Sequence, residues 1–171
     1  MLSFQDYLKL FPDTAADREQ LINEAIKAVI ALISSEVGYD IIKHQSSESY
    51  YMEFYNKIFL FRKPVISVDK VTLTNCDTKE LENYVFKDKV LRFEAAYDPK
   101  TLMSVTYTAG FEEFPDWLSY FILSNVNQML EMTENQDLTS YKIDTISYNF
   151  RKKEDFLSEL HEICRKITLL L

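Results

Sequence analysis

Residues 103–118 read MSVTYTAGFEEFPDWL, and this stretch separates a strand-forming part of the chain from a helix-forming part. From Met103 to Tyr107 every second residue is apolar, which is the period of a half-buried strand. Gly110 lets the chain turn after the strand, and Pro115 stands where the first turn of a helix accepts proline. The stretch therefore predicts a strand that ends before Gly110 and a helix that begins near Pro115.

Three long helices are predicted, each from a stripe of apolar residues that recur at steps of three and four. They are expected at about 15–36, 115–133 and 154–170. Thr14 and Asp17 have the spacing of a weak capping box near the start of the first helix, and Gly38 supplies a left-handed stop after it. Cys164 falls in the apolar stripe of the third helix, so we expect it to pack as a small hydrophobic residue.

From His44 to Thr108 the pattern changes to short aromatic or β-branched runs broken by polar residues, which is typical of strands. The expected strands are 50–55, 58–61, 65–74, 84–86, 90–93 and 103–108. The first two flank Asn56-Lys57, whose asparagine tolerates a positive φ, and are predicted to form a hairpin. The fourth and fifth are predicted to form another antiparallel pair around the polar residues 87–89.

The order of these elements predicts an α+β, mainly α fold: an antiparallel bundle of about three long helices with an inserted set of short antiparallel β-hairpins. We expect a single domain, 1–171. The helical body would comprise about residues 1–43 and 110–171, and the β insertion about residues 44–109. A segment at 141–150 alternates like a lone strand, so its backbone must pair with a sheet edge or with another chain.

The composition argues against several classes of function. The formal charge of −8 disfavours binding to nucleic acid, because phosphate binding needs clustered Lys and Arg. With two glycines, two cysteines and two histidines, the chain has no glycine-rich phosphate loop, no short metal-ligand spacing and no nucleophile elbow. It also has no run of about 18 apolar residues. We therefore expect no enzyme, no cofactor, no metal and no membrane partner, and a reduced, cytoplasmic chain without a signal peptide.

Glu112, Glu113 and Asp116 place three carboxylates beside a helix start. Such a group could provide a general acid and a general base if its members had different pKa values. Carboxylates at a helix N-terminus are also stabilised by the helix dipole without any pocket. The second explanation is the stronger one.

The two histidines have few residues near them in the sequence that could share a metal ion or a proton with them. His161 and Cys164 are three residues apart on one predicted helical face, so a metal or a thiolate-imidazole pair is geometrically possible, but no other ligand is in local reach. His44 stands alone in a polar stretch and is assigned to a solvated loop.

Two stretches are candidates for contacts with other proteins. Residues 50–61 hold more aromatic side chains than one face of a small hairpin can bury, so part of this stretch is expected at a protein contact. Arg151, Lys152 and Lys153 form the only three-residue basic run. That run is either a solvated face together with the acids that follow it or a contact with an acidic partner surface.

Several segments, taken in order, resemble one protein family. They are a leading apolar helix, residues 58–65 (IFLFRKPV) with Val68 and Val71, and residues 105–111 (VTYTAGF) with Pro115 and Asp116 opening a helix. This arrangement resembles tailed-phage head-tail connector proteins, also called head-completion or adaptor proteins, which occur in prophages too. The resemblance covers about residues 5–150.

The resemblance implies a structural, non-enzymatic subunit that forms a homo-oligomer ring between portal and tail. DNA would pass through the ring without sequence-specific binding. The implied partners are the phage portal protein and a tail-side neck or tail-completion protein, and the implied location is the virion neck after assembly in the bacterial host cytoplasm. On this basis we expect Tyr148, Phe150, Arg151 and Lys152 to contact a neighbouring subunit or the portal.

Two other functions fit parts of the sequence. A soluble protein-binding module or regulator would recognise another protein through its aromatic surface. A small hydrolase would use Glu112 and Glu113 and would need a concave site around them.

Overall fold

The structure is a computed structural model that describes residues 2–51, 56–75, 77–87, 90–94, 97–98, 100–135 and 153–169. The chain divides into two compact units. We call residues 1–38 and 113–166 the helical unit, and residues 39–112 and 167–171 the β unit. The organisation as one domain stays a prediction.

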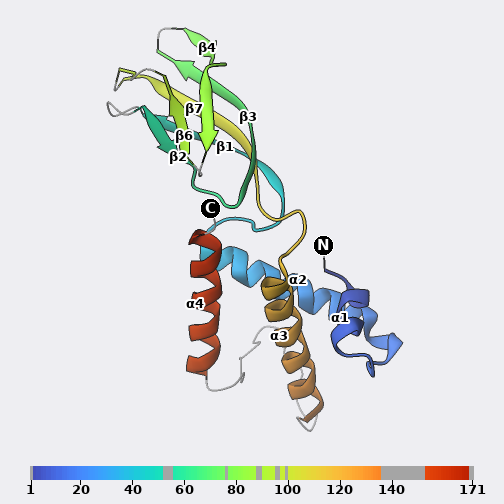
Figure 1. The fold of residues 1–171 in the computed structure, drawn as a ribbon. Coiled ribbons are helices and arrows are strands. Elements are labelled where there is room, and N and C mark those ends of the chain that lie inside the picture. Colours follow the sequence, from blue (N-terminus) through green and yellow to red (C-terminus); the bar gives the residue numbers. More distant parts are fainter. Residues whose placement is uncertain are drawn as a thin grey trace. The chain divides into compact units, whose positions relative to one another are not determined.

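Four α-helices are present in the described residues (Figure 1). They are α1 (Phe4–Leu10), α2 (Glu19–Val37), α3 (Asp116–Asn135) and α4 (Lys153–Leu169), and a short 3-10 helix, η1 (Ala16–Arg18), precedes α2. The three long helices lie close to their predicted ranges, and Gly38 ends α2 in the left-handed region with a φ of 82°. No described helix is both long enough and apolar enough to cross a membrane.

Apolar stripes of the long helices are buried, as the periodicity predicts. The buried residues are Ile22, Ile26, Val29, Ile30, Ile33 and Val37 of α2, Leu118, Phe121, Ile122, Leu123, Val126 and Leu130 of α3, and Phe156, Leu160, Ile163, Cys164 and Ile167 of α4. The core packing predicted for Cys164 is confirmed. Burial, followed by the negative charge of Glu36, raises the pKa of the Cys164 thiol to about 11.

The first helix, α1, was not predicted from the sequence. Its Tyr7 is buried, and the Tyr7 hydroxyl donates a hydrogen bond of 2.7 Å to Asn127 Oδ1 of α3. At the helix start, the Asp6 carboxylate accepts hydrogen bonds from the backbone N–H and the hydroxyl of Ser3. Its hydrogen bond with Lys9 is the largest cause of a lowered pKa of Asp6.

The capping box predicted at Thr14 and Asp17 is wrong. The residue that caps α2 is Arg18, and no side chain caps that helix end. The Thr14 hydroxyl instead donates to the backbone carbonyl of Phe11, 2.9 Å away. That hydrogen bond closes a local turn, and α2 begins at Glu19, too far along the chain for the Thr14 side chain to cap it.

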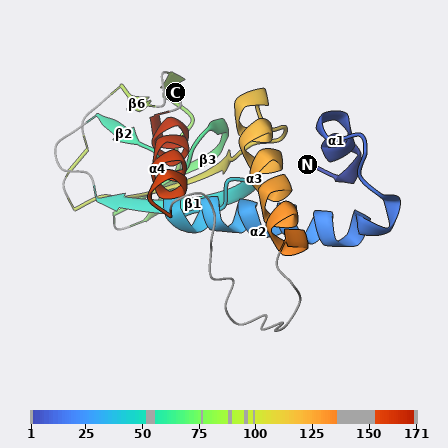
Figure 2. The same ribbon diagram turned by 90° about the horizontal axis from the view of Figure 1, so that it is seen from below.

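The predicted fold class is wrong, because a bundle of three long helices is not present. The described residues form four helices and two antiparallel sheets. α2 packs against α3 but crosses it instead of running alongside it (Figure 1 and Figure 2). A bundle needs apolar stripes that face one another along whole helices, and a crossing joins only part of each stripe. The strands, moreover, have a core of their own and are not hairpins attached to a helical body.

The β unit contains seven strands in the described residues. They are β1 (His44–Tyr51), β2 (Lys57–Phe59), β3 (Val65–Thr74), β4 (Thr78–Glu80), β5 (Tyr84–Lys87), β6 (Val90–Phe93) and β7 (Leu102–Ala109). One sheet has the order β1-β7-β3-β4 and the other β2-β6-β5, and all named pairs are antiparallel. The antiparallel pair of β5 and β6 around residues 87–89 was predicted and is confirmed.

The core of the β unit contains side chains from both sheets. On β7, Met103, Val105 and Tyr107 are fully buried, as the alternation predicts. They belong to one apolar cluster with Ile58 of β2 and Leu91 of β6. Because each sheet presents every second side chain to this cluster, the opposite face of each sheet points away from the core.

The hairpin predicted around Asn56-Lys57 stays a prediction, because its first strand falls largely on residues that are not described. β1 pairs with β7 over eight residues, from His44 opposite Ala109 to Tyr51 opposite Leu102, whereas β2 pairs with β6 in the other sheet. Residues 52–55 lie outside the described residues. The eight-residue register gives β1 ladder hydrogen bonds and cross-strand contacts along its whole length.

Gly110 fixes how β7 ends. Its φ is +95°, and a Cβ atom built on it would lie 2.4 Å from the backbone oxygen of Ile42. The backbone N–H of Phe111 donates to the carbonyl of Ile41, and that of Lys43 donates to the carbonyl of Phe111. Glycine is required here by both the backbone conformation and the close approach of another backbone segment.

Candidate interaction surfaces

The four contact residues predicted from the resemblance, Tyr148, Phe150, Arg151 and Lys152, lie outside the described residues. The extended segment predicted at 141–150 lies outside them too. Their role in contacts with another subunit or with the portal stays a prediction.

The carboxylates at the α3 start are not gathered into a catalytic site. Glu112 and Glu113 are exposed, and Glu112 Oε1 lies 2.8 Å from Lys43 Nζ in an exposed ion pair. Asp116 is exposed in the first turn of α3, where the helix dipole favours a negative charge. Of the two remaining candidates, His161 is exposed and lies 3.2 Å from Glu36, while Cys164 is buried in the core. No cluster of three potential metal ligands occurs among the described residues.

A polar cluster around Glu48 lies inside the β unit. The Tyr107 hydroxyl donates to Glu48 Oε1 at 2.6 Å, and the Tyr50 hydroxyl donates to Glu48 Oε2. Arg62 Nε lies 3.6 Å from Glu48 Oε1. Burial, followed by the hydrogen bond to Glu48, raises the pKa of Tyr50 and of Tyr107 above the ordinary tyrosine value. Both phenols therefore stay protonated donors to the carboxylate at neutral pH.

This cluster holds the loop that follows β2. The backbone N–H of Arg62 donates to the Tyr107 hydroxyl at 3.1 Å, and that of Phe61 donates to Glu48 Oε2 at 3.3 Å. His44 Nδ1 lies 2.8 Å from the carbonyl oxygen of Ile42, so it donates, and His44 Nε2 can then accept from Arg62 Nη1 at 3.4 Å. The prediction of a solvated loop for His44 is wrong, because it lies in β1 with a partly buried side chain.

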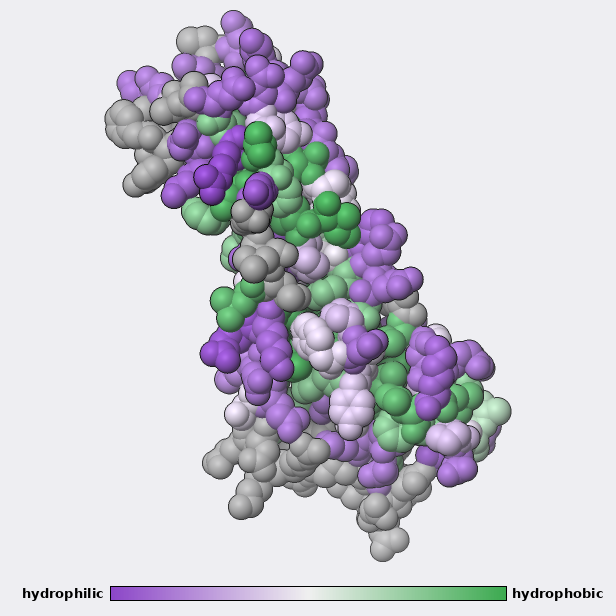
Figure 3. All heavy atoms as spheres, in the orientation of Figure 1, coloured by the Kyte–Doolittle hydropathy of each residue, from purple (hydrophilic) through white to green (hydrophobic). Residues whose placement is uncertain are grey.

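The exposed aromatic side chains of the β unit lie next to this loop in sequence. Tyr51, Phe59 and Phe61 are 70%, 62% and 61% exposed, whereas residues 52–55 lie outside the described residues. In Figure 3 hydrophobic residues (green) are exposed on the β unit, while its end around β4 is hydrophilic (purple). The stretch does place aromatic rings at the surface, and their contact with a protein stays a prediction.

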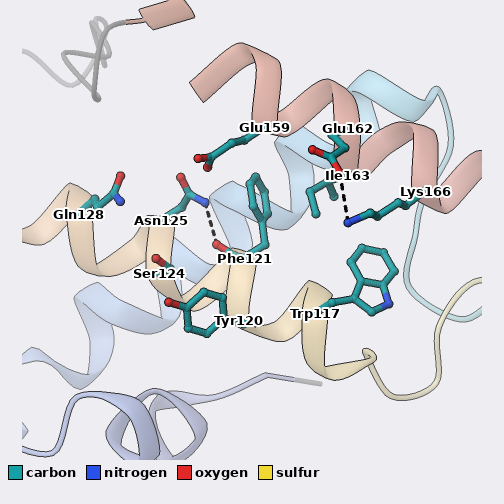
Figure 4. Close-up of a pocket in the computed structure, with 10 residues that line it drawn as sticks. All are labelled: Trp117, Tyr120, Phe121, Ser124, Asn125, Gln128, Glu159, Glu162, Ile163 and Lys166. Carbon is teal, nitrogen blue, oxygen red and sulfur yellow. Dashed lines mark hydrogen bonds and ion pairs between the residues drawn. The ribbon is translucent and has the colours of Figure 1, made fainter. Parts of the chain in front are cut away.

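A pocket of about 290 Å³ lies between α3 and α4 of the helical unit (Figure 4). α3 contributes Trp117, Tyr120 and the buried Asn125, and α4 contributes Glu159 and Lys166. Figure 4 shows Glu159 over Asn125 at one end and Lys166 beside the Trp117 indole at the other. The Asn125 amide donates to the backbone carbonyl of Phe121 at 2.7 Å.

The pocket has the chemistry of a site for a cationic side chain. Lys166 Nζ lies 6.0 Å from the centroid of the Trp117 ring and 3.4 Å from Glu162 Oε1. Carboxylates and aromatic faces are the groups that attract an ammonium or a guanidinium. None of these residues was singled out as a site residue from sequence, because only the packing of two distant helices brings them together.

Comparisons with known proteins give a family and a fold. The sequence model of a family described as Head completion protein matches residues 1–120. No curated protein matches the chain. A chain in the neck of an empty gene transfer agent particle, computed with C6 symmetry, is 15% identical with a TM-score of 0.56 and covers 82% of this chain and 83% of its own length. A chain in the virion of a native gene transfer agent particle is 16% identical with a TM-score of 0.56, covering 98% of this chain and 88% of its own.

Proposed function

The chain belongs to the head completion protein family, and from that membership we propose that it forms a ring between the portal and the tail of a phage or prophage particle. The match over residues 1–120 is the observation that carries the proposal, because it includes α1, α2 and all seven strands. The relationship to head-tail connector proteins expected from the sequence is confirmed, and the chain is a structural head-tail connector protein.

The ring is supported by the fold that the chain shares with the solved structures. One of those chains comes from a neck computed with C6 symmetry. Rings form when two different surfaces of each subunit mate with the next subunit and the rotation closes. This chain presents different surfaces on its two units, namely exposed aromatic residues on the β unit and the α3–α4 pocket on the helical unit.

The charge of the chain is compatible with passage of DNA through the ring. A formal charge of −8 gives an acidic subunit, and an acidic lining repels phosphate instead of holding it. The duplex would pass without sequence-specific contacts. The role requires no chemical step, no cofactor and no metal, so the proposed subunit is not an enzyme.

The proposed partners are the portal protein on one side and a tail-side neck or tail-completion protein on the other. The proposed location is the virion neck, reached after assembly in the host cytoplasm. Within this proposal Tyr148, Phe150, Arg151 and Lys152 contact a neighbouring subunit or the portal.

Particles produced without this chain test the proposed function. We expect capsids that carry the portal but no tail, visible by electron microscopy, and tails restored when the full chain is supplied from a plasmid. Tailed particles of normal yield in the absence of the chain would contradict the proposal. A plasmid that supplies the chain with a stop codon in place of Tyr7 is the matched control for restoration.

A further inference from the structure

The outer face of the three-stranded sheet is cationic. In the register of β2, β6 and β5, Lys57 lies opposite Arg92, and Arg92 lies opposite Val85. The next row on the same face has Phe59 and Lys87 on either side of Val90, which is only 7% exposed. We call these five exposed residues the cationic sheet face. It contains one basic side chain from each strand and no acidic one.

The cations of this face have no carboxylate partner among the described residues. The ion pairs of the described residues use other side chains. Lys57 Nζ lies 5.7 Å from the centroid of the Phe59 ring. Phe59 and Val85 are 62% and 59% exposed between the cations. Exposed apolar side chains interleaved with cations fit a protein partner with an acidic surface better than they fit a bare phosphate backbone.

The acidic charge of the chain is concentrated on the other unit. The helical unit contains 16 Asp and Glu against 9 Lys and Arg, a formal charge of −7. The β unit contains 11 Asp and Glu against 10 Lys and Arg, a formal charge of −1. A second copy of this chain therefore offers the cationic sheet face a surface of opposite charge, on its helical unit.

The α3–α4 pocket is the place on the helical unit with matching chemistry. It already holds the ammonium of Lys166 near the Trp117 ring and Glu162. At its other end the Glu159 carboxylate lies over Asn125 (Figure 4), and the ring of Tyr120, which is 63% exposed, also lines the pocket. A pocket of about 290 Å³ is large enough to receive the head group of one more basic side chain.

We propose that the cationic sheet face of one copy binds the α3–α4 pocket of the next copy, with Lys57 and Arg92 reaching the Glu159 end of that pocket. The two surfaces differ, so the contact is heterologous and repeats from copy to copy. The inference rests on the proposed ring and names the contact that builds it. Opposite charges speed encounter and select the partner surface, while Phe59 and Val85 supply apolar contact area.

The test combines the substitutions Lys57→Glu and Arg92→Glu in one variant. Mass photometry then counts the copies of the chain that bind to each portal as the concentration of the chain is raised. Both positions are exposed, so the fold should be retained, and circular dichroism checks this. We expect the midpoint concentration for assembly to rise about tenfold or more. Lys79→Glu with Lys100→Glu makes the same change of charge at exposed positions elsewhere in the β unit and should shift the midpoint less than about twofold.

Complementation makes the test specific for the two surfaces. Glu159→Lys impairs the pocket, and Lys57→Glu with Arg92→Glu impairs the face. Each variant alone should assemble poorly, whereas an equimolar mixture should assemble at close to the wild-type concentration, because a ring in which the two variants alternate pairs opposite charges at every contact. A mixture that assembles no better than either variant would overturn the proposal.

Two further outcomes separate this inference from the proposed function. If the face variant assembles on portals like the wild type but loses affinity for a 30-base-pair DNA duplex, measured by fluorescence anisotropy, then the face contacts DNA and the inference is wrong while the ring stands. If the wild-type chain itself neither binds portals nor self-associates, the proposed function fails and the inference fails with it.

Discussion

The hydroxyl of Tyr107 donates a 2.6 Å hydrogen bond to Oε1 of Glu48, and this bond joins the central strand β7 to the edge strand β1 inside the β unit. The same hydroxyl oxygen accepts from the backbone N–H of Arg62. Tyr107 is fully buried, so its hydroxyl makes both hydrogen bonds away from solvent. One tyrosine thus fixes two strands and the loop after β2, next to the exposed Phe59 and Phe61.

Tyr107→Phe should destabilise the chain by about 1–3 kcal/mol, because it leaves the partly buried Glu48 carboxylate and the backbone N–H of Arg62 without one partner each. Urea denaturation at pH 7 measures the change. Tyr51→Phe is the matched control: Tyr51 is 70% exposed, so the same loss of a hydroxyl should change stability by less than about 0.5 kcal/mol. Equal stability of the two variants would show that the Glu48 cluster does not hold the β unit together.

Stability should decrease at alkaline pH. The pKa values of Tyr50 and Tyr107 are raised in the folded chain, by burial first and then by Glu48. The unfolded chain therefore loses these protons first, so the stabilisation is complete below pH 10 and is lost as the pH rises above about 10. Cys164, with a raised pKa of about 11, contributes in the same direction. Urea denaturation from pH 8 to 11.5 should show this decline in the free energy of unfolding. The free energy of unfolding should fall less steeply with pH for Tyr107→Phe than for Tyr51→Phe.

The two glycines should respond differently to alanine. Gly38→Ala places a side chain at a φ of +82° in open space and should cost about 1–2 kcal/mol. Gly110→Ala adds a Cβ 2.4 Å from the Ile42 oxygen at a φ of +95°, and should cost about 3 kcal/mol or more. Thermal and urea denaturation of the pair measure the difference. A Gly110→Ala variant as stable as Gly38→Ala would refute the close approach described for the end of β7.

Tyr148→Asp combined with Phe150→Asp should abolish binding of the chain to portals, because two apolar contacts would become charged. Tyr148→Phe with Phe150→Leu keeps the apolar character and should bind like the wild type. Co-sedimentation with purified portal measures both. Normal binding of the aspartate variant would show that these residues are not part of the interface.

The sequence was sufficient for elements whose burial follows a regular period. Met103, Val105 and Tyr107 alternate in the sequence and are all fully buried. The helix predicted to begin near Pro115 is present as α3, from Asp116. Local patterns of this kind are decided by one face of one element, so neighbouring residues contain the information.

Features that depend on distant partners could not be predicted in the same way. β1 is polar along most of its length, and only its eight-residue register with β7 makes it a strand. His44 was assigned to solvent because its partner Arg62 is 18 residues away. The α3–α4 pocket depends on the packing of helices that are separated by residues 136–152. The prediction of a helical bundle was wrong for a related reason. Apolar stripes indicate which face of a helix is buried, but they do not indicate the angle at which two helices cross.

Imaging of the purified full chain mixed with its portal protein tests the central claim most directly. Electron microscopy with image averaging should show closed rings of this chain seated on one end of the portal, with a central opening wide enough for a DNA duplex. Portals without added density, in a mixture where the chain remains monomeric at micromolar concentration, would contradict the claim that this protein forms the connector ring.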